Sequence, residues 1–564
     1  MANLSQLKRE KMLDFLKKIK AEHQDDETLM SINEIENTLT EKKYGLVWEE
    51  HTERVDEEMV HNIPIFTEIE DRKIKNLESN DYNFLIEGDN LHSLKLFEKT
   101  HRGKIDVIYI DPPYNTGNKD FKYNDSFVEK TDEYSHSKWL SFMSKRLELA
   151  RNLLSEEGVI FISIDDKEQA QLKLLCDEIF GKDNFIANIT RNTNSSKNQS
   201  LYISISHEYC LVYSKNDIIL AKKHKEKKWE VDKNNIDEYK KRIKRLQKMN
   251  LSNEEITEEL KELTNYPRFI DFTNYWYVDE RGVYQKDNLG GVKNGNMNSI
   301  INPLTGKEDP IPPGGFRYKA EKLEELIKDN RIHFHTDGSL PRLKRYLDEN
   351  LKQRPKSIMS DDQRPDFSLL KKLNIEFDNP KQMTFMTRIL SIFEKNSTFL
   401  DFFAGSGTTG HAVMQLNKKD GGNRKYILCT NNENNICEEV TYQRLSKIQE
   451  ELPHNLKYFK TEFIPKFSEN EESSIKYQML NHVKELIELE YMCEIDGINN
   501  ILIKAEEEFD EIVNENMNEN IRLFVSSDIF ASKEQQLILE QKNIEKIEIP
   551  EYYYRSELRE VGEL

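Results

Sequence analysis

The chain has 564 residues, with 82 lysines and arginines against 102 aspartates and glutamates, so its formal net charge at pH 7 is −20. A mean hydropathy of −0.77 and the lack of any long apolar run exclude a membrane-spanning protein. The 27 Phe and 24 Tyr can fill several cores, which excludes global disorder. The length predicts roughly three to five domains. The acidic balance argues against a protein that coats nucleic acid, but it leaves room for local basic surfaces.

The cysteines and histidines are scattered without metal-ligand spacing, so we expect no disulfide framework and no metal site. The start of the chain lacks a signal-peptide core and cleavage site, which together with the cysteine usage favours a reducing cytoplasm. We also find no phosphate-binding G-x-x-x-x-G-K-[ST] loop, so this chain should not itself be an ATPase or helicase. The five cysteines are Cys176, Cys210, Cys429, Cys437 and Cys493.

In chain order, residues 1–80 predict an N-terminal region of mixed-charge helices, with leucines recurring at helical spacing. The pattern changes at residue 81. Strands and helices then alternate as far as residue 215, and this alternation predicts a doubly wound, mostly parallel α/β sheet. The predicted strands are 84–86, 105–110, 159–164 and 207–215, and the predicted helices include 139–154 and 167–180.

Residues 216–374 break that rhythm with lysine-rich and loop-rich segments, and we interpret them as an inserted unit. The α/β pattern resumes over 375–464, with strands at 397–403 and 425–430 on either side of a glycine-rich loop and a helix. Residues 465–564 are acidic and helical with two late strands, which indicates an accessory domain of mixed α+β character.

The first motif that carries chemistry is Asp111-Pro112-Pro113-Tyr114, directly after the apolar run 105–110. Open α/β sheets bind ligands at the carboxyl ends of their strands. The Asp111 carboxylate and the Pro112 carbonyl can each accept one N–H of an exocyclic amine, while Tyr114 stacks on the ring that bears it. Such an amine is a poor nucleophile because its lone pair is conjugated with the ring. Binding both hydrogens would turn the lone pair toward an electrophile.

The second motif is the loop from Gly405 to Gly410, which lies between a strand and a helix and matches G-x-G-x-x-G. Glu433 follows the next strand, in the position of a ribose-binding acid. Alone, this match fits a dinucleotide, S-adenosylmethionine or a plain strand–helix turn. A nucleoside site and a site for an aromatic amine in one sheet together favour methyl transfer. A hydride-transferring oxidoreductase would leave Asp-Pro-Pro-Tyr unexplained.

Five segments resemble the β-class amino-DNA methyltransferases, and most closely the modification (Mod) subunits of type III restriction-modification systems. In that family the catalytic motif precedes the cofactor motif, and a target-recognition domain lies between them. The order here is the same, because Asp111 precedes Gly405 and the basic insertion separates them. The segments are IEGDNLHSLKLF, IDVIYIDPPYNTGN, WLSFMSKRLELARNLL, GVIFISIDD and LDFFAGSGTTGHAV.

The resemblance implies roles for single residues. Asp111, Pro112, Pro113 and Tyr114 would form the target-base pocket, with the base flipped out of the duplex. The S-adenosyl-L-methionine site would comprise Asp401, Phe403, Gly405 and Gly407, with Glu433 on the ribose and Asp89 facing the adenine. Residues 377–381 resemble the segment over the methionine part, although Gln382 stands where the family usually has proline. Aspartate at position 111 favours adenine N6 over cytosine N4 as the methylated atom.

Two basic stretches of the insertion are candidates for contacts with DNA phosphates, although a charge run can equally be a solvated face. Acidic residues lie among the first of them, and both readings stay open. The candidates are Lys241, Arg242, Lys244 and Arg245 in one stretch and Arg342, Lys344 and Arg345 in the other.

The expected partners are double-stranded DNA, a second copy of the chain and a separate restriction subunit that carries cleavage. The expected activity is site-specific adenine-N6 methylation of DNA. Three alternatives remain: a cytosine-N4 enzyme, a solitary methyltransferase without a nuclease, and a catalytically silent DNA-recognition subunit. Intact Asp111, Tyr114 and glycine loop argue against the last of these, because a binding module does not need all three.

Overall fold

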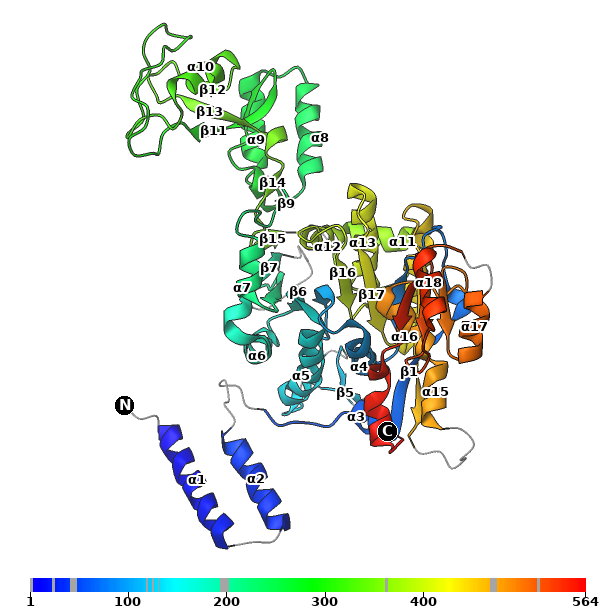
Figure 1. Cartoon of the computed structure of the whole chain (residues 1–564). Helices are drawn as coiled ribbons and strands as arrows, with labels where there is room; N and C mark the ends of the chain where they lie inside the picture. Colours follow the sequence, from blue (N-terminus) through cyan, green and yellow to red (C-terminus); the bar gives the residue numbers. More distant parts are fainter. Residues whose placement is uncertain are drawn as a thin grey trace.

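A ten-stranded sheet lies at the centre of the computed structural model, which describes residues 4–22, 26–40, 48–117, 120–123, 126–129, 131–192, 202–360, 364–466, 474–514 and 518–563 (Figure 1). Most neighbouring strands run parallel, while β8 is antiparallel to both its neighbours and β1 is antiparallel to β18. In spatial order the strands are β1 (Asn62–Glu68), β18 (Leu456–Pro465), β2 (Asn83–Glu87), β17 (Lys425–Thr430), β16 (Thr398–Asp401), β3 (Ile105–Ile110), β6 (Leu154–Ile164), β8 (His207–Ser214), β7 (Phe185–Asn192) and β15 (Ile358–Ser360).

Helices cover both faces of this sheet, and a separate apolar core lies under each layer. The central strands are buried on both faces, as their continuous apolar runs predict. The predicted doubly wound, mostly parallel α/β fold is therefore confirmed. One layer contains α4 (Asn90–His101), α5 (Ser135–Leu153), α6 (Gln169–Cys176) and α16 (Val483–Tyr491), and the other contains α7 (Asp217–Lys223), α12 (Met383–Leu390), α13 (Thr408–Asp420) and α14 (Gln443–Lys447).

Four strands of the sheet, β1, β7, β15 and β18, lie where the sequence analysis predicts none. Two of them fall inside stretches assigned to other domains, since β1 lies within 1–80 and β15 within 216–374. The domain boundaries stay predictions. A search for apolar runs does not find these strands. β1, β7 and β15 are partly exposed for most of their length, and β18 becomes exposed in its second half.

The insertion forms a unit that stands away from the sheet in Figure 1 and joins it through the short pair β9–β14 and strand β15. Its own antiparallel sheet has the order β10-β11-β13-β12 and two small apolar cores. The elements are β9 (Val231–Asp232), α8 (Ile236–Gln247), α9 (Asn253–Leu263), β10 (Tyr277–Asp279), β11 (Gly282–Asn288), α10 (Ala320–Lys328), β12 (Ile332–His333), β13 (Arg342–Tyr346) and β14 (Lys352–Gln353).

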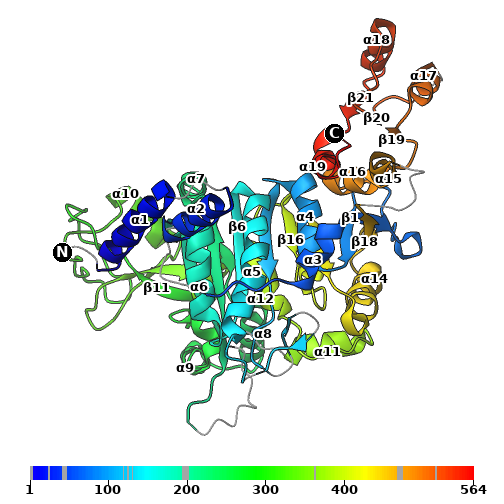
Figure 2. The same cartoon turned by 90° about the horizontal axis from the view of Figure 1, so that it is seen from below.

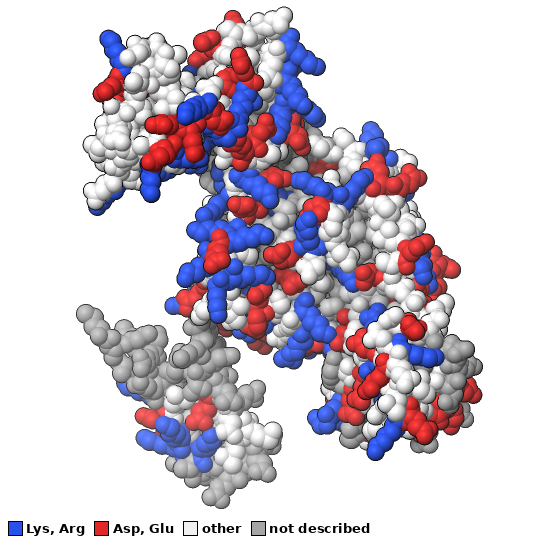
Figure 3. All heavy atoms as spheres, turned by 45° about the horizontal axis from the view of Figure 1, so that its top comes forward, with Lys and Arg blue, Asp and Glu red and all other residues white. Residues whose placement is uncertain are grey.

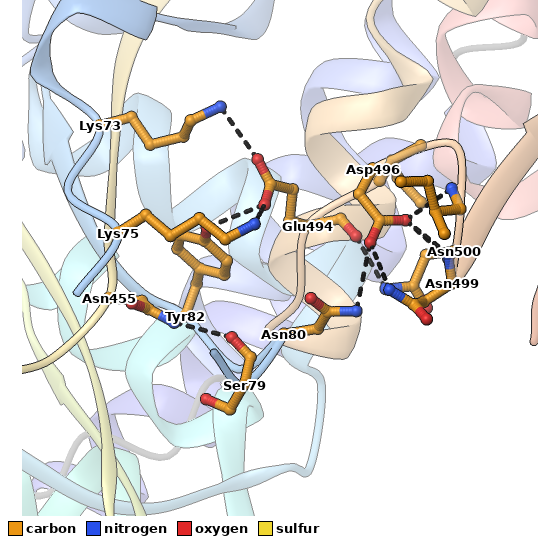
Figure 4. Close-up of polar contacts among 12 residues, drawn as sticks. Lys73, Lys75, Ser79, Asn80, Tyr82, Asn455, Glu494, Asp496, Asn499 and Asn500 are labelled. Carbon is orange, nitrogen blue, oxygen red and sulfur yellow. Dashed lines mark hydrogen bonds and ion pairs between the residues drawn. The ribbon is translucent and has the colours of Figure 1, made fainter. Parts of the chain in front are cut away.

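The C-terminal region ends in a three-stranded parallel unit that projects from the body in Figure 2. Glu494 ties its base to the segment before β2, since the carboxylate accepts bonds from Lys73 at 2.9 Å, Lys75 at 3.0 Å and Tyr82 at 2.8 Å (Figure 4). These partners lower the pKa of Glu494 to about 2 against the opposing effect of burial. The elements are α15 (Ile475–Asn481), β19 (Asn500–Ile503), α17 (Glu506–Asn514), β20 (Arg522–Val525), α18 (Lys533–Gln541), β21 (Glu545–Glu548) and α19 (Arg555–Glu560).

The N-terminal helices α1 (Leu4–Glu22) and α2 (Asp26–Thr40) contact each other and lie apart from the sheet in Figure 1. They are followed by α3 (Arg54–His61), which packs beside β1. The chain also forms the hairpin of β4 (Lys122–Tyr123) and β5 (Ser126–Phe127) and helix α11 (Arg364–Lys372). Within the described ranges, no helix combines the length and apolar character that a membrane crossing requires.

Candidate active site

The two sequence motifs meet because β3 and β16 are neighbours in the sheet. These strands pair in parallel, with Phe399 opposite Val107 and Leu400 opposite Ile108. Asp111 follows the end of β3, and the glycine loop follows the end of β16, so both motifs emerge at the carboxyl edge of the sheet. This edge is where open α/β sheets bind their ligands.

Buried hydrogen bonds hold the loop after β3 in place. The indole N–H of Trp139, which is fully buried, donates to the Pro113 carbonyl at 2.7 Å. Asn115 adopts a left-handed backbone with φ 56°, and its side chain donates to Glu168 at 2.6 Å. The Tyr114 hydroxyl donates to Asp111 Oδ1 at 2.8 Å. The first motif is thus a fixed turn with its carboxylate and phenol in contact.

Three charged residues surround this turn, and the sequence analysis gave none of them a role at Asp111. Lys381 Nζ lies 3.0 Å from Asp111 Oδ1 and 2.9 Å from Glu208 Oε2. Arg191, which is 1% exposed, reaches the same Glu208 oxygen at 3.3 Å. We call Asp111, Tyr114, Arg191, Glu208 and Lys381 the Asp111 cluster. Lys381 ends the 377–381 segment, whereas Arg191 and Glu208 are single charges at strand ends with no motif around them.

The charges of the Asp111 cluster shift one another's proton affinities. Burial lowers the pKa of Lys381, but the carboxylates of Asp111 and Glu208 outweigh it and hold that pKa above the ordinary value. Burial raises the pKa of Glu208, yet Lys381 and Arg191 hold it below its usual range. Burial and the nearby Asp111 raise the pKa of Tyr114 well above its ordinary value. The phenol therefore stays protonated and can donate a hydrogen bond.

The loop after β16 is built on Asp401. Its Oδ1 accepts from the Phe403 backbone N–H at 3.0 Å, and its Oδ2 accepts from the Thr409 hydroxyl at 2.5 Å. Gly405 and Gly407 have φ values of 49° and 72°, in the left-handed region that favours glycine. A Cβ on Gly407 would lie 3.2 Å from the Thr441 methyl, while one on Gly405 would meet the Phe377 ring at 3.7 Å.

A buried arginine supports this loop from below. Arg444 has no exposed surface, and its Nη1 donates to the Ser406 carbonyl at 3.2 Å, the Ser406 hydroxyl at 3.1 Å and the Thr408 hydroxyl at 2.8 Å. Burial lowers the pKa of Arg444 to about 10, so it remains a cation at neutral pH. The sequence gives no signal for this role, because Arg444 belongs to no motif and its partners lie in a distant loop.

The remaining residues predicted for the cofactor lie around the loop. Asp89 caps α4 by accepting from the Leu91 N–H at 2.7 Å, and its Oδ1 lies 3.4 Å from Arg146. The Phe403 ring lies 5.9 Å from the Phe142 ring. Glu433 follows β17, the strand beside β16, and pairs with Lys122 of the β4–β5 hairpin at 2.6 Å.

This set of residues fits a nucleoside cofactor. The backbone at Gly405 can be approached closely because a side chain there is absent, and an acidic group at the end of the adjacent strand can accept bonds from ribose hydroxyls. Glu433 is 45% exposed, so its bond to Lys122 can be exchanged for a ligand. The ring of Phe377, in the segment that the resemblance places over the methionine part, lies beside Gly405 of the loop.

The predicted DNA contacts fall on two different surfaces. Lys241, Arg242, Lys244 and Arg245 are all exposed on α8, and none of them pairs with a carboxylate of the described residues. On β13, by contrast, Lys344 is 7% exposed and pairs with Asp279 at 2.9 Å, and Arg345 pairs with Asp287 at 2.6 Å. Arg342 is half-buried on the same strand.

The fold and the paired motifs are those that the sequence analysis expects of an S-adenosylmethionine-dependent methyltransferase. A family model described as DNA methylase matches residues 105–442, which is more than half of the chain. The chain therefore belongs to the DNA methylase family.

Two curated relatives cover much of the chain. The chain is 32% identical over 443 residues to the Mod subunit of the type III restriction-modification enzyme EcoP15I of Escherichia coli, a match that covers 71% of this chain and 66% of the relative. It is 30% identical over 413 residues to the type II methyltransferase M.KpnI of Klebsiella pneumoniae, which covers 67% of this chain and 90% of that relative. The match thus spans just under two thirds of the EcoP15I subunit but nearly all of M.KpnI.

Among solved structures, the chain is similar to a DNA modification methylase of Thermus thermophilus, TTHA0409, in complex with S-adenosyl-L-methionine. The sequence identity is 12% and the TM-score 0.31, with 67% of this chain and 97% of that chain covered. The family assignment rests on the sequence matches. Within the described residues, no three His, Cys, Asp or Glu side chains gather as metal ligands.

Proposed function

We propose that this chain transfers a methyl group from S-adenosyl-L-methionine to adenine N6 in a specific sequence of double-stranded DNA, with the base flipped out of the duplex. The pairing of β3 with β16 is the observation that carries the proposal, because it brings an amine-binding motif and a nucleoside-binding loop to one sheet edge. A protein that only binds DNA has no use for this arrangement.

The cofactor supplies a methyl carbon on a positively charged sulfur. The Asp111 carboxylate accepts an N–H of the base amine, and the Pro112 carbonyl accepts the other. When bound, the cofactor would offer that methyl carbon to the N6 lone pair, and the electron pair of the broken carbon–sulfur bond would stay on sulfur. The proton that N6 loses passes to Asp111 or to water. Lys381 stabilises the ionised cluster and orients Asp111, whose Oδ1 already accepts from Tyr114.

Adenine is favoured over cytosine by the aspartate at position 111, through the resemblance to β-class enzymes. Both rings offer an exocyclic amine, so cytosine N4 is the alternative target. The chemistry needs no cysteine nucleophile, and the five cysteines are all buried. We include a cytoplasmic location in the proposal, because the scattered cysteines do not have the spacing of a disulfide framework.

We further propose that the chain acts as a Mod subunit, with a second copy and a separate restriction subunit as partners. The similarity to type III Mod subunits supports this role. A second candidate is a solitary or type II methyltransferase. The match to M.KpnI favours it, because that match covers 90% of the relative's length. Size-exclusion chromatography with light scattering would decide between monomer and dimer, and co-purification with a helicase–nuclease subunit encoded next to it would decide the role.

The exposed face of α8, formed by Lys241, Arg242, Lys244 and Arg245, is proposed to contact DNA phosphates. Figure 3 shows Lys and Arg side chains gathered on the inserted unit and on the core beside it, with Asp and Glu among them. The β13 basics are weaker candidates, since carboxylates of the same sheet already pair with Lys344 and Arg345.

Single-molecule sequencing of DNA from cells that express the wild type, Asp111→Ala or Tyr114→Ala tests the activity and the base together. We expect N6-methyladenine at one short motif with the wild type and none with either variant. N4-methylcytosine at a motif would show that the methylated base is cytosine and not adenine. A folded wild-type protein that binds S-adenosylmethionine and leaves DNA unmodified, alone and with its partner subunit, would overturn it.

A further inference from the structure

Three large apolar side chains are exposed within four residues, just before β8. Tyr202 is 93% exposed, Ile203 is 80% exposed and Ile205 is 48% exposed. Each apolar Å² left in water forgoes about 25 cal/mol of stabilisation, so a cluster of this kind usually marks a binding surface. We call residues 202–206 the β8 entry segment.

The β8 entry segment ends two residues before Glu208 of the Asp111 cluster. The chain leaves the sheet at the end of β7 and returns at the start of β8, where Asn192 pairs with His207. The next residue, Glu208, lies 3.4 Å from the Tyr114 hydroxyl and 2.9 Å from Lys381. At about 3.3 Å per residue, Tyr202 is within roughly 20 Å of Glu208 even when the chain is fully extended.

Duplex DNA is the occupant that this position allows. A base that reaches Asp111 must leave its stack, which costs a few kcal/mol and opens a gap in the duplex. An apolar side chain inserted into such a gap repays part of that cost by restoring contact with the neighbouring bases. A protein docked permanently over the β8 entry segment would stand in the path of the incoming base.

We propose that Tyr202, together with Ile203, enters the base stack of the DNA at the position that the flipped target base vacates. This inference rests on the proposed function, since it supplies the step that delivers the base to the Asp111 cluster. The aromatic ring stacks on the adjacent bases, and the Ile203 side chain fills the groove beside it. Tyr202 is in these terms a positioning residue, because it does not touch the reacting atoms.

The test uses the full chain and a duplex with the methylated motif mapped by sequencing, in which 2-aminopurine replaces the target adenine. This base becomes fluorescent when it leaves the stack. The wild type should raise the fluorescence severalfold, and Tyr202→Ala should lose most of that rise. Tyr202→Trp should retain it. Tyr477→Ala is the matched control, because Tyr477 is also an exposed tyrosine, at 62%, but lies on α15.

A second duplex, with the target adenine opposite an abasic site, separates insertion from general DNA contact. Tyr202→Ala should methylate the normal duplex at least tenfold more slowly than the wild type, yet come within about twofold of it on the abasic duplex. Equal losses on both duplexes, or wild-type rates and fluorescence in Tyr202→Ala and Ile203→Ala, would overturn the inference. If the wild type methylates neither duplex, the proposed function itself fails.

Discussion

The ammonium of Lys381 lies 3.0 Å from Asp111 Oδ1, and the same nitrogen lies 2.9 Å from Glu208 Oε2. One cation thus bridges two carboxylates, one just after β3 and the other in β8. Without it, two partly buried negative charges would face each other, which is a costly arrangement in a site of low dielectric. In the proposed function, Lys381 would set the charge state in which Asp111 receives the base amine.

Replacing Lys381 by Met should lower kcat by about tenfold or more and move the acidic limb of the kcat–pH profile to higher pH. The sign follows from Glu208, whose pKa is now held low by Lys381 and Arg191 against burial. Removing Lys381 lets that pKa rise, so the cluster protonates at a higher pH. Lys381→Arg should keep the profile. An unchanged profile in Lys381→Met, with the exposed Lys371→Met as control, would contradict this account.

Asp401→Asn should change how stability depends on pH. Burial raises the pKa of the Asp401 carboxyl to about 7, against 3.8 in the unfolded chain. Between these values the unfolded state releases the proton that the folded state keeps, so rising pH costs the wild type stability, on the order of a few kcal/mol by pH 7. The asparagine variant should lack this loss.

Urea unfolding of both proteins from pH 4 to pH 8 measures this effect. The difference in free energy of unfolding between Asp401→Asn and the wild type should grow in favour of the variant as the pH rises through this window. Asp528→Asn, at a side chain that is 77% exposed, should show a constant difference. A constant difference for Asp401→Asn as well would show that the carboxyl is ionised in the folded protein throughout.

Arg444→Met should weaken S-adenosylmethionine binding by at least tenfold while the fold is kept. The methionine fills the space but leaves the Ser406 carbonyl and the Thr408 hydroxyl without their donor, so the glycine loop loses its support. Titration calorimetry measures the affinity, and circular dichroism checks the fold. Lys447→Met, in the same helix but at an exposed position, should bind as the wild type does. Equal affinities in the two variants would contradict the supporting role.

Neutralising Lys241, Arg242, Lys244 and Arg245 together should weaken DNA binding and flatten its salt dependence. Each phosphate contact adds about 0.9 to the slope of log K against log salt, so loss of two or more contacts is readily measured. Changing Lys504, Lys533, Arg555 and Arg559 alters the net charge equally on the C-terminal region and should leave the slope unchanged. Identical slopes for both variants would show that the basic residues of α8 are a solvated face and do not contact DNA.

The sequence predicts the parts of the site that depend on short, continuous patterns. Apolar runs ending at Asp111 and at Asp401 mark two buried strands, and both motifs follow from their residues alone. The partners in the Asp111 cluster do not, because Glu208 and Arg191 meet only through the antiparallel pairing of β7 with β8. Which strands become neighbours depends on the packing of the whole sheet, and a short motif does not carry that information.

The same reasoning applies to the edges of the sheet. Strand β18 mixes charged and apolar residues and becomes exposed in its second half, where only β1 pairs with it beyond the end of β2. Such strands are stabilised by their neighbours more than by their own composition. Buried Arg444 was missed for a related reason, since its partners are backbone and hydroxyl groups of a distant loop.

The position of β2 in the sheet determines when, during synthesis, the sheet can form around it. Its five residues are buried, and its two neighbours are β17 and β18. Roughly 340 residues must leave the ribosome after β2 before the first of these partners exists, which takes about 20 to 70 seconds at 5–20 residues per second. During that time β2 is an apolar segment without a partner strand from this sheet. The sheet between β2 and β16 can therefore close only after β17, which ends at Thr430, has been made.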